Sequence, residues 1–161
     1  MTRMVDARFE DGDDAPLRLM AQEADDVPVL AALVQDAVFP ITEMTWARRR
    51  RRFAILLNRF RWEDRAAAER EGRPYERVRS LLTFDNVLAV RSQGIDRGDT
   101  DTILSLLSLA FHPGPEGSGR IELILAGDGA IELQVEALDI VLTDVSRPYR
   151  APSGHVPRHE A

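Results

Sequence analysis

The amino-acid sequence predicts a single α+β domain: a curved antiparallel sheet of about six to eight strands with one N-terminal amphipathic helix packed on one face. Three stretches predict this fold. Residues 120–136 alternate apolar and polar side chains on both sides of Gly127-Asp128-Gly129, as a β-hairpin does. Residues 52–62 are apolar on both faces, which is typical of a central strand. Residues 26–38 repeat apolar side chains at helical spacing.

The length and composition fit one domain with one core. The chain has 161 residues, of which 44% are hydrophobic. Residues 1–16 are acidic and residues 147–161 are rich in Pro and Arg, so we expect disordered tails around a domain at 17–146. No signal peptide is visible, and the longest apolar stretch, 103–111, is roughly half of a membrane span. We therefore expect a soluble cytoplasmic protein.

The net charge and the missing residue types exclude several classes of function. The net charge of −6 disfavours binding to nucleic acid and to anionic membranes through the field of the whole molecule. The chain has no cysteine, which excludes disulfides, thiolate nucleophiles and thiolate metal sites. All 21 basic residues are arginine, which excludes a Walker A lysine, a Schiff-base lysine and a lysine general base.

The first half of the chain predicts one helix between strands. Residues 17–21 alternate and predict a short first strand. The helix at 26–38 begins at an aspartate N-cap, and Pro40 stops it. Residues 41–47 and 52–62 are then predicted as two strands joined at a run of arginines.

The second half predicts mostly strands. Residues 63–73 are charged and predict a surface loop with one helical turn, after which alternation resumes at 78–82. Residues 103–111 fit either a strand or a short helix, but the loop at 113–119 and the strand after it favour a strand. Alternation at 138–145 predicts an extension of the last strand through a bulge.

The hairpin has a predicted register. With residues 127–129 as a three-residue loop and Gly129 in the left-handed conformation, three apolar pairs face each other across the two strands. These are Leu125 with Ile131, Leu123 with Leu133, and Ile121 with Val135. All six side chains then lie on one face, where they form the predicted core.

Five separated stretches carry a resemblance to a known family. They are Ala32–Val38, Arg51–Glu63, Phe84–Val90, Leu104–Leu107 and the hairpin loop Gly127–Gly129. In this order they resemble a bacterial family filed as domain of unknown function 2948, over roughly residues 17 to 150. The resemblance implies a single domain and implies no activity, cofactor or catalytic residue.

Polar residues beside the central strand form one candidate ligand-binding site. Asn58, Arg59 and Glu63 lie on or next to that strand, where polar groups need partners. Gln35 and Asp36, at the end of the predicted helix, are the residues expected to line a cleft with them. The alternative is that hydrogen bonds within the fold satisfy all of these side chains.

No catalytic residue, metal site or cofactor is predicted. Sequence spacing brings no two carboxylates to the separation that acid–base catalysis needs. His155 and His159 are four residues apart, but Pro157 between them breaks the helix that would direct both at one metal ion.

The arginine run is the sharpest charge feature. It consists of Arg48, Arg49, Arg50, Arg51 and Arg52. Weak RNA binding is one hypothesis, because guanidinium groups bind phosphate and the nearby Phe60 and Trp62 can stack on bases. A solvated turn before a buried strand is the other, and the acidic net charge favours it.

The leading function hypothesis is a non-enzymatic accessory or interaction domain that binds another protein or itself. No catalytic motif is present, and the edges of an apolar sheet must pair or be protected. One alternative is a small-molecule binder or enzyme with a cleft near Asp36, Asn58, Arg59 and Glu63. The other is the weak RNA binder, although nucleic acid is not the expected partner, and no membrane contact is expected.

Overall fold

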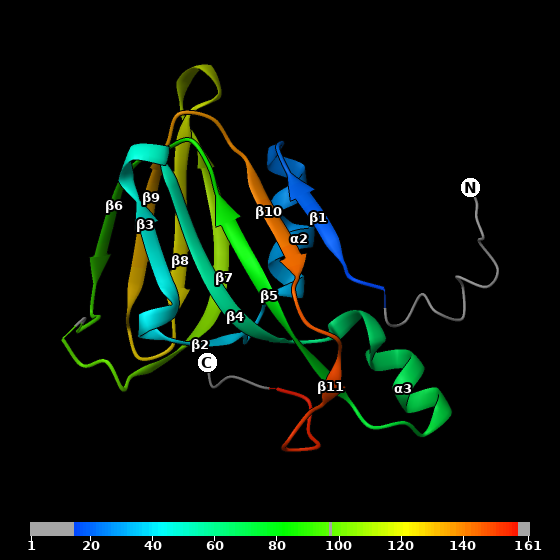
Figure 1. Cartoon of the computed structure of the whole chain (residues 1–161). Coiled ribbons are helices and arrows are strands. Elements are labelled where there is room, and N and C mark those ends of the chain that lie inside the picture. Colours follow the sequence, from blue (N-terminus) through cyan, green and yellow to red (C-terminus); the bar gives the residue numbers. More distant parts are fainter. Residues whose placement is uncertain (1–14, 97, 158–161) are drawn as a thin grey trace.

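The computed structural model describes residues 15–96 and 98–157, which form eleven strands and two short α-helices (Figure 1). The strands are β1 (Arg18–Ala21), β2 (Val38–Pro40), β3 (Met44–Ala47), β4 (Arg52–Phe60), β5 (Glu76–Phe84), β6 (Val87–Gln93), β7 (Ile103–Pro113), β8 (Gly119–Leu125), β9 (Ala130–Val135), β10 (Ile140–Asp144) and β11 (Tyr149–Arg150). The α-helices are α2 (Val27–Leu33) and α3 (Arg65–Glu71). Short 3-10 turns are η2 (Ala24–Asp26), η3 (Ile41–Glu43), η4 (Arg48–Arg50), η5 (Trp62–Asp64) and η6 (Pro115–Gly117).

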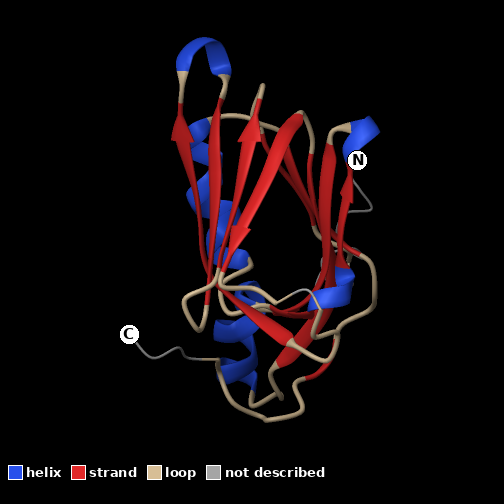
Figure 2. Cartoon of the chain, turned by 90° about the vertical axis from the view of Figure 1, so that its left-hand side faces the viewer, coloured by secondary structure: helices blue, strands red, loops and turns tan. Residues whose placement is uncertain are grey.

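The strands form one open, antiparallel sheet that folds over into two layers. Their order is β1-β10-β5-β4-β2-β7-β8-β9-β6, with β3 beside β4 and β11 beside β5. Among the described strands, β2 is the one that pairs with both layers, with β4 on one side and β7 on the other. Figure 2 shows the two layers from the side.

The core lies between the two layers. Inward-facing, buried side chains alternate along the strands, as the period-two pattern requires. One layer contributes Phe53, Ile55, Leu57, Leu82 and Phe84, and the other contributes Leu106, Leu109, Ile121, Leu123, Leu125, Ile131, Leu133 and Val135. The helix α2 adds Val27 and Leu30 to the same cluster.

The hairpin of β8 and β9 is confirmed, but the predicted register is wrong by two residues. The structure pairs Leu123 with Ile131, Ile121 with Leu133, and Gly119 with Val135. A shift by two residues preserves which side chains share a face. The six apolar side chains predicted to lie on one face are therefore all buried.

The loop of the hairpin explains the shift. The backbone N–H of Leu125 donates to the carbonyl oxygen of Gly129 at 2.8 Å, so the loop is 126–128. Gly127, at φ 81°, and Asp128, at φ 68°, take the left-handed conformation in place of Gly129. Aspartate tolerates this conformation better than most residues, which the glycine-based prediction did not consider.

The sheet has more strands than the predicted range of about six to eight, because short strands leave no readable alternation. The strands β2 and β11 are three and two residues long. The ambiguous stretch at 103–111 is a strand, as predicted, and continues to Pro113 in β7. The charged stretch at 63–73 contains a complete short helix, α3, where a loop with one turn was predicted.

The predicted N-terminal helix is longer than the observed one, and the observed helix is not clearly amphipathic. The helix α2 has seven residues, and the exposed fraction of Val29 is 58%. Asp36 takes φ 62°, and its N–H donates to the carbonyl oxygen of Leu106 at 2.8 Å. The N–H of Leu106 in turn donates to the carbonyl oxygen of Ala37 at 2.8 Å, so bonds to β7 replace the last helical turn.

The two expected tails differ in how far the structure describes them. Residues 1–14 lie outside the described residues. Within 147–157, the chain forms β11 and buries Ala151 against the domain.

Replacing Leu123 by aspartate is expected to unfold the protein. Leu123 is fully buried between the layers, and a carboxylate there costs several kcal/mol, about the whole stability of many domains. The measurement is the far-UV circular dichroism spectrum together with urea unfolding. Leu88→Asp is the matched control, because Leu88 is 47% exposed on β6, and this variant is expected to keep the native spectrum. A native sheet spectrum for Leu123→Asp would contradict the proposed core.

Candidate functional site

A buried arginine lies near the end of β4. The Arg59 side chain is 0% exposed and forms ion pairs with Glu63 at 2.8 Å and with Asp144 of β10 at 3.1 Å. The Ser80 hydroxyl of β5 accepts a hydrogen bond from Arg59 Nε at 3.1 Å and donates to Asp144 Oδ1 at 2.7 Å. The charge is buried among groups that satisfy it, and the cluster joins three neighbouring strands.

Further ion pairs extend this cluster toward α3. Arg61, whose side chain is 6% exposed, forms an ion pair with Glu76 at the start of β5. Arg73 follows α3 and binds both carboxylate oxygens of Asp64 at 3.1 Å. The Asp64 side chain, which is only 3% exposed, also lies 3.8 Å from Arg61, so ion pairs connect the start of α3 with the end of the sheet.

The pKa values of the cluster favour a structural role. Burial raises the pKa of Glu63, but the hydrogen bond and the positive charge of Arg59 outweigh burial and hold it below its ordinary value. Burial lowers the pKa of Arg59, and its contacts with Glu63 and Asp144 raise it above its ordinary value. A general acid or base works best with a pKa near the operating pH, and both shifts move away from neutrality.

The predicted ligand-binding residues divide between the two faces of β4. Arg59 lies on the inner face and is bound by Glu63. Asn58 lies on the opposite face, because successive strand residues alternate. There the Asn58 amide donates to the Tyr149 hydroxyl and accepts from Arg77 Nε. The structure thus brings Arg59 and Glu63 together and separates them from Asn58.

Gln35 and Asp36 come just before β2. The backbone carbonyl of Gln35 accepts a hydrogen bond from Trp62 Nε1 at 3.0 Å. Asp36 is 7% exposed and lines an open cleft of about 730 Å³, together with Arg77. The negative charge of Asp36 acts on Arg77, so Asp36 and Asn58 both approach that arginine.

Sequence reasoning missed Ser80, Asp144 and Arg77. Ser80 and Asp144 fall in phase with the buried apolar residues of their strands, and a polar residue at such a position signals a buried partner. Arg77 is out of phase with the buried residues and resembles any surface arginine. No sequence signal distinguishes it.

A slot lies between the edge strands β3 and β6. Among the described strands, β3 pairs with β4 alone and β6 pairs with β9 alone. At one end the layers are joined, because the N–H of Val87 donates to the carbonyl oxygen of Arg51 at 2.8 Å. Beyond that bond, the slot encloses about 80 Å³. Its lining is mostly apolar: Ile41, Met44, Trp46, Phe53, Val90, Ser92, Ile95 and Ile131.

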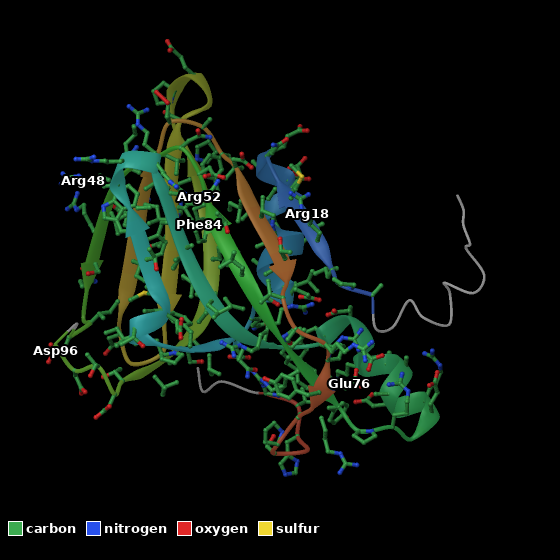
Figure 3. All side chains as sticks on the ribbon, viewed as in Figure 1. Arg18, Arg48, Arg52, Glu76, Phe84 and Asp96 are labelled. Carbon is green, nitrogen blue, oxygen red and sulfur yellow. The ribbon has the colours of Figure 1, made fainter. Side chains whose placement is uncertain are left out.

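The arginine run forms the turn between β3 and β4, at the closed end of the slot. Figure 3 labels Arg48 and Arg52 there, and Asp96 near the opposite end of β6. Arg51 pairs with Glu136 at 3.2 Å, and Arg52 pairs with Asp85 at 2.8 Å. The other three arginines, 48–50, are exposed and form no ion pair with any described residue. They therefore present unneutralised positive charge beside the slot.

Residues 17–159 match the family model described as "Protein of unknown function (DUF2948)". The chain belongs to this family. No curated protein and no solved structure matches the chain. The DUF2948 match spans the buried arginine cluster, the slot and the cleft, so all three belong to the family's domain.

The described part of the DUF2948 domain has neither a cluster of metal-ligating side chains nor a helix that could span a membrane. In residues 15–96 and 98–157, no group of three or more His, Cys, Asp or Glu side chains is placed to hold a metal ion. In the same part of the chain, no helix has the length and apolar character to cross a membrane.

Replacing Asp144 by alanine is expected to destabilise the DUF2948 domain by about 3 to 5 kcal/mol, because it removes one partner of a buried ion pair. The measurement is the free energy of unfolding in urea. Glu69→Ala is the control, since the Arg65–Glu69 pair is half exposed and such pairs contribute about 1 kcal/mol or less. Equal losses for the two variants would show that the buried cluster does not support the fold.

The lowered pKa of Glu63 predicts a loss of stability in acid. The charged form is favoured in the folded state, so its contribution is complete above the ordinary pKa of 4.5 and is lost as the pH falls through the lower, folded pKa. The free energy of unfolding is expected to fall less between pH 7 and pH 3 for Glu63→Gln than for the wild type. Glu116→Gln, in the exposed turn η6, is expected to follow the wild type. Parallel curves for all three proteins would refute this role of Glu63.

Proposed function

We propose that this DUF2948 domain is an interaction domain that binds an extended, acidic peptide segment of a partner protein in the slot between β3 and β6. The observation that carries the proposal is that two strands with unpaired edges border one apolar slot. The bound segment adds a strand to the sheet, as in known cases of β-strand addition.

The backbone of the two edge strands supplies the affinity. In an antiparallel pair, every second residue of an edge strand directs its N–H and C=O away from its single partner. The strand β6 has seven residues and β3 has four, and no described bond joins them along the slot. A peptide segment between β3 and β6 can therefore form backbone hydrogen bonds with both strands.

The slot lining supplies selectivity for apolar side chains. Met44 and Trp46 are partly buried on β3, and Val90 is partly buried on β6. A volume of about 80 Å³ suits one or two small apolar side chains rather than a large ligand. Because alternate residues of a strand point to opposite faces, the bound segment alternates apolar and polar residues.

The exposed arginines supply a preference for acidic residues. Arg48, Arg49 and Arg50 lie in the turn that follows β3, so they flank one end of the slot. Guanidinium groups that lack carboxylate partners bind carboxylates of a partner in bidentate geometry. This positive charge attracts an acidic segment of a partner protein and repels the arginine-rich turn of a second copy of this chain.

The two other functions considered for the sequence have less support. A small-molecule site that joins Asp36, Asn58, Arg59 and Glu63 requires side chains from both faces of β4. RNA binding through the arginine run would depend on three arginines without ion pairs, and the net charge of −6 of the chain repels the phosphates of RNA.

Replacing Ser92 by tryptophan is expected to block the slot. Ser92 is exposed on β6 and lines the slot, so the larger side chain fills it while leaving the core unchanged. A library of random ten-residue peptides is first selected on the wild-type protein, and the best peptide is titrated by fluorescence anisotropy. We expect acidic peptides with alternating apolar residues, and roughly tenfold or greater weakening in Ser92→Trp.

Ser108→Trp is the matched control, because Ser108 is exposed on β7, away from the slot. This variant is expected to bind the selected peptide as the wild type does. Selection of no peptide, or equal binding by both tryptophan variants, would refute the slot as the binding site. Preferential binding of an RNA oligonucleotide that is lost when Arg48, Arg49 and Arg50 become serine would establish the RNA function instead.

A further inference from the structure

Arg77 differs from the other arginines that are removed from bulk water. Arg59, Arg61, Arg73 and Arg120 each have a carboxylate oxygen within 4.0 Å. Arg77 is also partly buried, yet no described carboxylate lies within that distance. In a chain whose buried arginines are otherwise neutralised by its own carboxylates, this exception indicates a place for an anion from outside.

Hydrogen bonds hold the Arg77 side chain in one orientation. Its Nε donates to Asn58 Oδ1, and its Nη2 donates to the backbone carbonyl of Asn58 at 3.0 Å. The Asn58 amide is fixed in turn by the Tyr149 hydroxyl. The remaining nitrogen, Nη1, donates to no described group. Binding an anion therefore requires no loss of side-chain freedom from Arg77.

The surroundings leave the charge of Arg77 poorly compensated. Burial lowers the pKa of Arg77, and the opposing effects of Tyr149 and Asp36 do not restore it to its ordinary value. Guanidinium groups stay protonated at all physiological pH values, so the lowered pKa means a positive charge with too little solvation. An anion in contact with Arg77 would relieve this cost.

The cleft beside Arg77 has the size and lining of a small-molecule site. Its volume is about 730 Å³, and it lies between the segment 153–157 and the ends of β7 and β8. Typical ligand pockets combine mostly apolar walls with a few polar groups. Here the apolar wall includes Leu107, Ile124 and Val156, and the polar side chains are Asp36, Arg77, Ser105, Asp128, Ser153 and His155.

We propose that this cleft binds a small monocarboxylate with an apolar tail, with its carboxylate on Arg77 and its tail against Leu107, Ile124 and Val156. Inorganic phosphate has no apolar tail to pack against Leu107, Ile124 and Val156, so the site favours the monocarboxylate over phosphate. The cleft shares no lining residue with the slot between β3 and β6, so this proposal is independent of peptide binding.

Hexanoate is the probe, with hexanamide and inorganic phosphate for comparison. The full chain, labelled with ¹⁵N, is titrated with each compound while its amide resonances are recorded. Hexanoate is expected to shift the amide resonances of Ser105, Leu107 and Val156 in a saturable manner, and hexanamide and phosphate are expected to bind roughly tenfold more weakly or not at all. Absence of saturable shifts there, or binding of phosphate as tight as that of hexanoate, would overturn the proposal.

Arg77→Gln tests the role of the guanidinium, and Arg70→Gln on the exposed face of α3 is the matched control. We expect at least about tenfold weaker hexanoate binding in Arg77→Gln and unchanged binding in Arg70→Gln. Ser105→Trp fills the cleft from β7 without touching the Asn58–Arg77 bonds, and it is expected to abolish binding even if Arg77→Gln fails to fold. Wild-type affinity in either Arg77→Gln or Ser105→Trp would overturn the assignment.

Discussion

The two-layer arrangement depends on the pairing of β2. This strand has three residues, and Val38 pairs with Asn58 of β4 on one side and with Ser105 of β7 on the other. Backbone bonds just outside it reinforce the join, from Asp36 to Leu106 and from Ile41 to Thr102. Among the described strands no other is shared by both layers, so β2 sets how the two layers are joined at this end, while the bond from Val87 to Arg51 joins them at the other.

The strand β4 marks where the apolar core ends. From Phe53 to Leu57 its inner residues pack between the layers, and at Arg59 the same face becomes charged. On the outer face, Asn58 begins a second polar group with Arg77 and Tyr149. Two polar environments thus start at consecutive residues and are kept apart by the sheet itself. One of them is closed by the chain's own carboxylates, and the other opens onto a cleft.

Most of the strands predicted from the sequence carry a regular pattern. Inner residues at every second position revealed β8 and β9, and apolar side chains on both faces revealed β4. For β7 the pattern also fitted a helix, and the loop and strand that follow it decided in favour of a strand. The strands β2 and β11 are too short to show a period. Val34 and Ala37 continue a helical spacing but are buried after the chain has left the helix, because bonds to β7 compete with the last turn.

The candidate site could be predicted only in part. Asn58, Arg59 and Glu63 stood out because polar groups beside an apolar strand need partners. Their partners could not be read from the sequence, since Asp144 is 85 residues from Arg59 and meets it only through strand pairing. The separation of Asn58 from Arg59 follows from alternation alone, because consecutive residues of a strand point to opposite faces.

The short length of β3 limits what the slot can hold. Four residues extend over roughly 13 Å, and the bond between Val87 and Arg51 closes the slot at one end, so a strand inserted there cannot grow past it. Such a contact offers few backbone hydrogen bonds and little enclosed area, which favours rapid dissociation over permanent assembly. The geometry is therefore suited to a complex that forms and separates repeatedly.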